Sequence, residues 1–140
     1  ETIVNETGVS LAVPPGMDKV TKQVHTRGSY QGWLSVFELT RPYPLIYIPL
    51  YASIASILIP GLGVHCFTLD LAASTGAGKT TAMQLGVSAW GKPTVGDGLI
   101  RSWDDNQVFS ERAAGVLGNL PLYNDETKRA RSADAVATRS

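Results

Sequence analysis

Apolar positions gather in the middle of the chain, where residues 45–69 include no Asp, Glu, Lys or Arg. Prolines and glycines interrupt this stretch. Its unbroken piece, residues 50–59, is shorter than the roughly 20 residues that a membrane-spanning helix needs. We therefore predict a buried core helix that ends at Pro60-Gly61, and no membrane span. The apolar residues that follow predict a strand over residues 66–72.

The segments on either side show shorter patterns. Before the apolar stretch we expect a turn at Pro14-Pro15-Gly16, an edge strand and loop over 20–32, and a helix through about Leu39. After it we expect a helix over 81–90, a short strand within 94–101, a helix over 104–117 capped by Ser102, and a strand over 120–124. Strands and helices alternate over this second half, which predicts the α/β class.

The most informative run is Ala73-Ser74-Thr75-Gly76-Ala77-Gly78-Lys79-Thr80-Thr81. It matches the phosphate-binding pattern Gly-x4-Gly-Lys-Ser/Thr between a strand and a helix, except that Ala73 replaces the first glycine. Glycines let consecutive N–H groups turn toward phosphate oxygens, and the helix dipole favours the anion. We expect the eight residues from Ser74 to Thr81 to bind nucleotide. Lys79 would act on the outer phosphates and Thr80 on Mg²⁺.

A carboxylate pair, Asp125 and Glu126, follows the last predicted strand. ATP hydrolysis needs a carboxylate near Mg²⁺ and a group that orients and deprotonates the attacking water. We expect Asp125 to bind the metal directly or through water, and Glu126 to act on the water. An ordinary acidic turn after a strand is the alternative. Pro121 within this strand is unusual, because proline fits poorly in a central strand.

Composition narrows the remaining chemistry. Hydrophobic residues make up 44% of the 140 residues and charged residues 17%, which is enough apolar material for a core. Twelve basic and twelve acidic residues balance, so net charge neither favours nor excludes a nucleic-acid partner. Cys66 is the single cysteine, which rules out a disulfide within the chain and a zinc cluster of cysteines. We expect it to be a small buried hydrophobe.

The chain resembles the family called domain of unknown function 927. The resemblance rests on four runs: 67–85 with its Ser-Thr-Gly-x-Gly-Lys-Thr-Thr loop, Trp90-Gly91-Lys92-Pro93, Ser102-Trp103-Asp104, and 120–126. Members look like helicase-like ATPases of phages, plasmids and other mobile elements, often joined to primase modules. The resemblance implies a RecA-like or AAA-like parallel sheet, ATP and Mg²⁺ as ligands, and DNA replication as the setting. It places Lys79 and Thr80 on the nucleotide and metal, and Asp125 and Glu126 in the acidic motif.

We therefore expect a P-loop NTPase core over residues 43–128, preceded by a partial region over 1–42 and followed by a polar tail over 129–140. The family's later strands, sensor residue and arginine finger have no counterpart here, so we expect a truncated core that hydrolyses ATP weakly when isolated. The expected function is the ATP-binding segment of a cytoplasmic helicase-like ATPase that acts on DNA, and a homo-oligomeric ring is an assembly it could form. The alternatives are a P-loop ATPase of a transport or secretion system, and a nucleotide-binding module without turnover.

Overall fold

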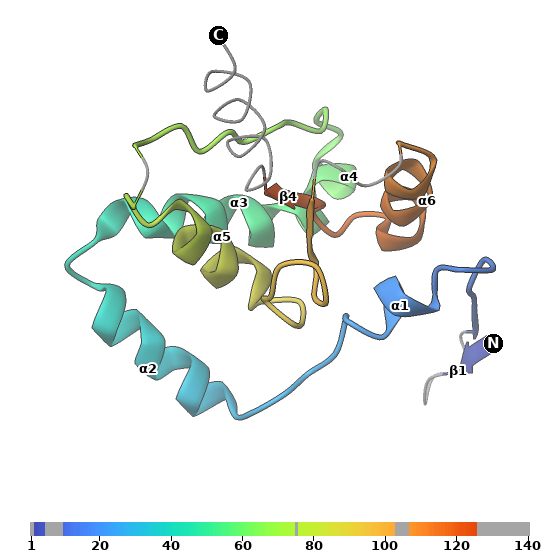
Figure 1. The fold of residues 1–140 in the computed structure, drawn as a ribbon, viewed down its shortest axis with the longest axis horizontal. Coiled ribbons are helices and arrows are strands. Elements are labelled where there is room, and N and C mark those ends of the chain that lie inside the picture. The colour runs from blue at the N-terminus through green and yellow to red at the C-terminus, as the bar shows by residue number, and fades with distance from the viewer. Residues whose placement is uncertain (1, 5–9, 75, 103–106, 126–140) are drawn as a thin grey trace, which may run out of the picture.

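The computed structural model describes residues 2–4, 10–74, 76–102 and 107–125. Figure 1 shows short helices around a small parallel sheet. In chain order the elements are β1 (Thr2–Val4), β2 (Ser10–Ala12), α1 (Asp18–Thr21), α2 (Tyr30–Thr40), the 3₁₀ turn η1 (Pro44–Ile46), α3 (Tyr47–Ala55), the 3₁₀ turn η2 (Ser56–Leu58), α4 (Ile59–Leu62), α5 (Lys79–Val87), β3 (Ile100–Ser102), α6 (Gln107–Leu117) and β4 (Tyr123–Asp125).

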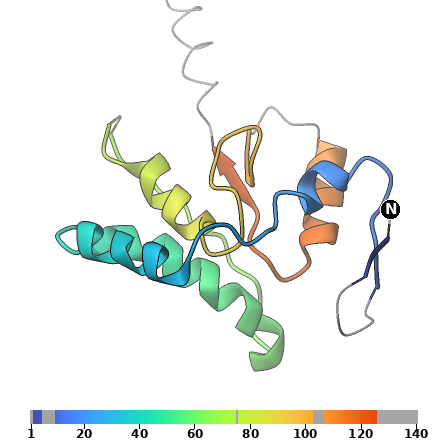
Figure 2. The same ribbon diagram turned by 90° about the horizontal axis from the view of Figure 1, so that it is seen from below.

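Strands β3 and β4 pair in parallel, with Ile100 opposite Tyr123 and Ser102 opposite Asp125. Helix α6 connects them, as a parallel pair requires. Helices α3 and α5 lie on one side of these strands and α1 and α6 on the other, as Figures 1 and 2 both show. Strands β1 and β2 form a separate antiparallel pair. A parallel pair is the kind of sheet the sequence predicts, and the larger RecA-like or AAA-like core stays a prediction.

Two apolar clusters hold these layers together. On the α1–α6 side, Met17 and Val20 pack with Ala113. On the α5 side, Val87 packs with Leu99 and Ile100. Leu117 on α6 packs against both clusters. The clusters therefore hold α5, which follows the phosphate motif, against the pair of strands β3 and β4. Strand β4 carries Asp125.

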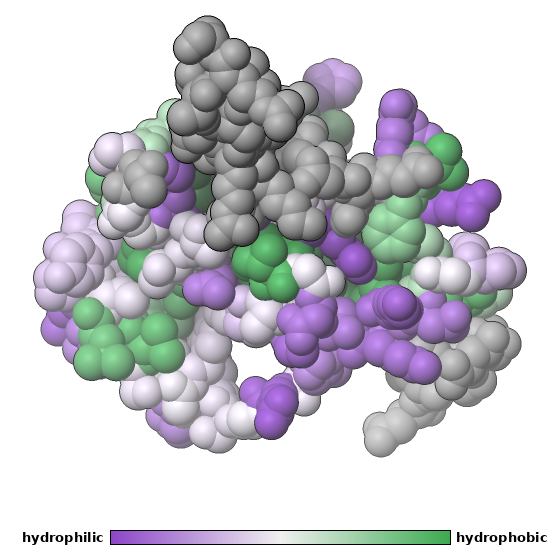
Figure 3. Space-filling model, in the orientation of Figure 1, coloured by the Kyte–Doolittle hydropathy of each residue, from purple (hydrophilic) through white to green (hydrophobic). Residues whose placement is uncertain are grey.

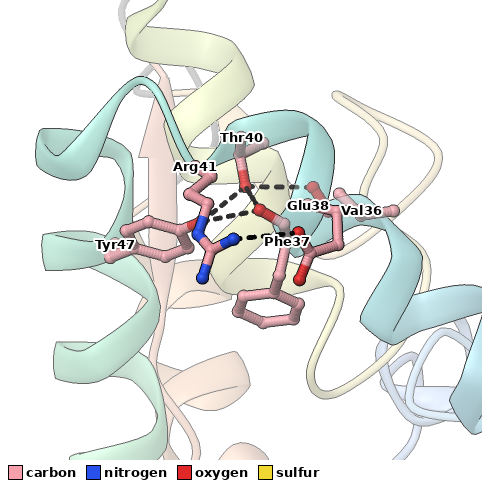
Figure 4. A network of polar contacts seen from close by, with 6 residues as sticks. All are labelled: Val36, Phe37, Glu38, Thr40, Arg41 and Tyr47. Atoms are coloured by element: carbon pink, nitrogen blue, oxygen red, sulfur yellow. Dashed lines mark hydrogen bonds and ion pairs between the residues drawn. The ribbon is translucent and has the colours of Figure 1, made fainter.

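The corner between α2 and α3 is fixed by a small polar network (Figure 4). The Tyr47 hydroxyl donates to the Phe37 carbonyl at 2.9 Å, and Thr40 Oγ1 lies 3.0 Å from the same hydroxyl. The rings of Phe37 and Tyr47 stack with centroids 5.7 Å apart. These contacts satisfy carbonyls near the end of α2 and set its direction relative to α3. The predicted helix through Leu39 is thereby confirmed, as Tyr30–Thr40.

The central apolar segment differs from its prediction. It is helical from Pro44 to Leu62, and Pro49 is accommodated because it lies in the first turn of α3, where proline is tolerated. This segment is long and apolar enough to cross a membrane, by length and composition alone. The predicted helix is present and continues through Pro60-Gly61 to Leu62, but its predicted burial is wrong, because only one side of α3 is covered. Leu50 is 1% exposed, whereas Tyr51 is 64% exposed.

Other local predictions were also wrong. Residues 64–74 form no helix or strand, although a strand was predicted over 66–72, and Cys66 is exposed rather than buried. A strand requires a neighbour to pair with, and in the described ranges β1 pairs with β2 and β3 with β4. The predicted edge strand after Val20 is likewise absent, and α1 occupies part of that region. Ser102 ends β3, and its predicted role as a helix cap concerns residues 103–106, which lie outside the described residues.

Candidate functional site

The phosphate motif forms a tight loop before α5. Gly76 and Gly78 have φ angles of +82° and +83°, in the left-handed region that residues with a Cβ rarely adopt. The Ala77 N–H donates to the Ser74 carbonyl at 3.3 Å, which closes the turn between them. The two glycines therefore stand where the backbone requires them, which explains that part of the motif physically.

Helix α5 begins directly after this loop, at Lys79. Its N-cap is Gly78, which has no side chain to accept hydrogen bonds from the first-turn amides. These amides carry the positive end of the helix dipole and are suited to an anion. The Lys79 ammonium donates to the carbonyls of Ala73 and Ser74, the latter at 3.0 Å. The Lys79 side chain is thus held against the loop to which a phosphate would bind.

Thr80 and Asp125 meet, although 45 positions separate them in the chain. Thr80 lies in the first turn of α5 and Asp125 ends β4, and the Thr80 hydroxyl donates to Asp125 Oδ2 at 3.5 Å. This is long for an O–H···O bond. Two oxygens that bind one octahedral Mg²⁺ side by side lie about 3 Å apart, given Mg–O distances of about 2.1 Å. The pair therefore fits a Mg²⁺ site after a small adjustment.

Three other predicted site residues, Thr75, Thr81 and Glu126, are not part of this contact in the described residues. Thr81 is exposed and lines an apolar hollow between α2 and α5, together with Trp33 and Gln84. Thr75 and Glu126 lie outside the described residues, and so do Trp103 and Asp104 of the family motif. No group of three or more Cys, His, Asp or Glu side chains suited to a metal occurs among the described residues.

Near the C-terminal end of α5, two serines accept hydrogen bonds from the side chains of two tryptophans. Trp90 Nε1 donates to Ser53 Oγ at 2.8 Å, and Trp33 Nε1 donates to Ser88 Oγ at 2.9 Å. Tyr123 of β4 also donates to Ser53. Sequence reasoning missed Ser53, because a lone serine in an apolar stretch gives no signal of what it contacts. The indoles of Trp33 and Trp90 thus connect elements that are distant in the chain.

A polar hollow lies away from the phosphate loop, lined by Lys19, Gln23, Gly96, Asp97, Gly98 and Arg101. Figure 3 shows hydrophilic residues gathered over α1 and the loop after α5. Asp97 accepts from Lys92 Nζ and from Thr94 Oγ1, each at 2.6 Å. These bonds, that of Lys92 first, hold the pKa of Asp97 below its usual value. The carboxylate is therefore engaged within its own loop.

Burial raises the pKa of the Tyr123 phenol to about 12, and its bond to Ser53 opposes this only in part. An unfolded tyrosine titrates near pH 10. The contribution to stability is thus complete below about pH 10 and declines as the pH rises toward about 12, because only the unfolded chain loses the proton there. We expect Tyr123→Phe to flatten the decline in unfolding free energy between about pH 10 and about pH 12, the window that the unfolded and folded pKa values set. Urea denaturation at each pH measures the unfolding free energy. Tyr51→Phe, which removes a phenol that is 64% exposed, should leave the wild-type profile, and an unchanged profile for Tyr123→Phe would contradict the assignment.

Comparison with known proteins identifies one family. The family described as Domain of unknown function (DUF927) matches residues 2–138 of the chain. No curated protein and no solved structure matches the chain. The match covers both the loop at residues 73–81 and the acidic pair at 125–126, so it includes every residue of the candidate site.

Proposed function

This chain belongs to the DUF927 family, and from that premise we propose that it is the ATP-binding and ATP-hydrolysing segment of a helicase-like ATPase. The contact between Thr80 and Asp125 is the observation that carries the proposal. A phosphate loop alone is a local motif. A phosphate loop whose hydroxyl faces a carboxylate at the end of a parallel strand has the two groups that Mg²⁺–nucleotide binding uses.

The chemistry then follows from the residues of the loop and the strand. The first-turn amides of α5 and the Lys79 ammonium would bind the phosphates, and Lys79 would exchange its carbonyl partners for phosphate oxygens. Thr80 and Asp125 would hold Mg²⁺, which would supply positive charge against the charge that develops on the outer phosphates. Glu126, adjacent to Asp125 in the sequence, would orient and deprotonate the attacking water. DNA as partner and a ring-shaped assembly rest on the family resemblance, and a cytoplasmic location is a further part of the proposal.

The test is ATP binding by calorimetry, in the presence of Mg²⁺. We expect Lys79→Ala to weaken ATP binding by at least roughly tenfold, because a charge-assisted phosphate contact contributes on the order of 1.5–3 kcal/mol. Lys92→Ala is the matched control. It removes a lysine that pairs with Asp97 beyond the opposite end of α5, and it should bind ATP as the wild type does. A folded wild-type chain that binds no ATP would refute the proposal.

One observation favours a second candidate, a P-loop ATPase of a transport or secretion system working at a membrane. The helical segment Pro44–Leu62 exposes several large apolar side chains, among them Ile48, Tyr51 and Leu58. Against this candidate, Leu50 and Ser53 of the same segment are buried and Ser53 is bonded to α5. Co-sedimentation with lipid vesicles separates the two candidates, because the membrane candidate requires binding to vesicles and the DNA candidate does not.

A further inference from the structure

The Ser53 hydroxyl is a buried junction of three hydrogen bonds. Ser53 lies on α3 and is 2% exposed. Its Oγ donates to the Gly86 carbonyl at 2.8 Å and accepts from Trp90 Nε1 at 2.8 Å and from the Tyr123 hydroxyl. A hydroxyl has one donor and two acceptor lone pairs. All three are therefore used, and three elements distant in the chain converge on one atom.

The Gly86 carbonyl belongs to the last turn of α5, where a helix leaves carbonyls without partners from its own backbone. Ser53 supplies that partner from α3. The two helices approach closely here, because a Cβ at Gly86 would lie 3.1 Å from the Pro49 carbonyl oxygen. A larger residue would push α3 and α5 apart. Gly86 thus allows α3 and α5 to lie close enough for Ser53 to donate its hydrogen bond to the Gly86 carbonyl.

The Tyr123 hydroxyl links the same junction to β4. Side chains two positions apart in a strand point to the same face, so Tyr123 and Asp125 share a face of β4. Thr80 and Gly86 lie six residues apart on α5, which is about 9 Å along a helix. Helix α5 is therefore connected to β4 at both ends: at Thr80 through Asp125, and at Gly86 through Ser53 and Tyr123.

We propose that Ser53 is a positioning residue for the Mg²⁺ site, because it fixes the placement of α5 against β4 and thereby the separation of Thr80 from Asp125. This role rests on the proposed function. Ser53 itself would touch neither nucleotide nor metal. Loss of its hydroxyl would leave the Trp90 N–H and the Tyr123 hydroxyl without their buried acceptor. The strand could then shift relative to the helix, and the metal pair would lose its geometry.

The experiment compares ATP affinity in Mg²⁺ with ATP affinity in EDTA, for Ser53→Ala and Tyr123→Phe in the whole chain. The ratio of the two affinities measures the contribution of the metal. Loss of a residue that orients metal ligands typically lowers metal affinity about 10- to 100-fold. We expect Ser53→Ala to lower the ratio by about tenfold or more, and Tyr123→Phe to lower it in the same direction by less. ATP affinity in EDTA should stay at the wild-type value, because the loop and Lys79 are unchanged.

Ser88→Ala is a matched control that isolates positioning from stability. Ser88 Oγ accepts from Trp33 Nε1 and donates to the Leu85 carbonyl at 2.6 Å, so it makes the same kinds of bond at the same end of α5. Neither of these bonds involves β4. Ser88→Ala should therefore lower the melting temperature and leave the Mg²⁺ ratio unchanged.

Each outcome has a distinct meaning. If Ser53→Ala and Tyr123→Phe keep the wild-type ratio, or if Ser88→Ala lowers it equally, Ser53 is structural only and the inference is overturned. If Ser53→Ala does not fold, Tyr123→Phe decides, because it keeps the ring and removes a single hydroxyl. If the wild-type chain binds ATP in neither buffer, the proposed function itself fails and the positioning role falls with it.

Discussion

Glu126→Gln is expected to lower the rate of ATP hydrolysis about 10²- to 10⁴-fold while ATP affinity stays near the wild-type value. General-base catalysis contributes a factor of this size, and the amide keeps the shape of the side chain but cannot take a proton from water. Steady-state phosphate release measures the rate, and calorimetry in Mg²⁺ measures the affinity. Because kcat falls and binding does not, this variant separates an ATPase from a nucleotide-binding module without turnover.

Glu111→Gln is the matched control for this experiment. Glu111 lies on α6 and accepts from Gln107 Nε2 at 2.9 Å on an exposed surface. The same carboxylate-to-amide change there should leave hydrolysis unaltered. Equal rates for the wild type and Glu126→Gln would remove Glu126 from the chemistry. No measurable hydrolysis by the wild type would favour the module without turnover.

Leu50→Ala is expected to lower the free energy of unfolding by about 2–5 kcal/mol, the range for truncating a fully buried leucine. Leu50 is 1% exposed, and it lies one helical turn before Ser53, which is bonded to Gly86 of α5. A small domain has only about 5–15 kcal/mol of stability in total, so the loss would be a large part of it. Urea denaturation followed by circular dichroism measures the change.

Leu58→Ala, in the same apolar segment, provides the comparison. Leu58 is 55% exposed, and a substitution at such a position usually changes stability by less than about 0.5 kcal/mol. A large difference between the two variants would establish that the Pro44–Leu62 segment is folded against α5 on one side only. Similar effects of Leu50→Ala and Leu58→Ala would mean that the two leucines have the same surroundings. The packing of only one side of this segment against α5 would then be wrong.

The phosphate loop could be predicted from sequence because its structure is local. Gly76 and Gly78 have left-handed φ angles, and α5 begins at Lys79, close to where the sequence places it. Turns, glycine requirements and helix starts depend on residues within a few positions of one another. The acidic pair was predicted on the same basis, from an apolar strand followed by carboxylates. Strand β4 covers Tyr123–Asp125 rather than 120–124, and Glu126 lies outside the described residues.

The errors all involve burial or pairing between distant residues. The sequence shows that residues 45–69 are apolar and uncharged, but it does not show which side of α3 meets α5. The strand predicted over 66–72 has suitable residues, yet pairing depends on whether a neighbouring strand is present. Both properties are settled by the rest of the fold.

By itself, the sequence predicted the family, the glycine-rich loop and the helix after it, because each is encoded in short runs of neighbouring residues. The residues proposed for ATP and Mg²⁺ come from the same short runs. Only the tertiary structure decided that Thr80 meets Asp125 across 45 positions, and that Ser53, Gly86 and Tyr123 converge on one buried hydroxyl. Such contacts arise when helices and strands pack, and no local pattern encodes the distance between two side chains far apart in the chain.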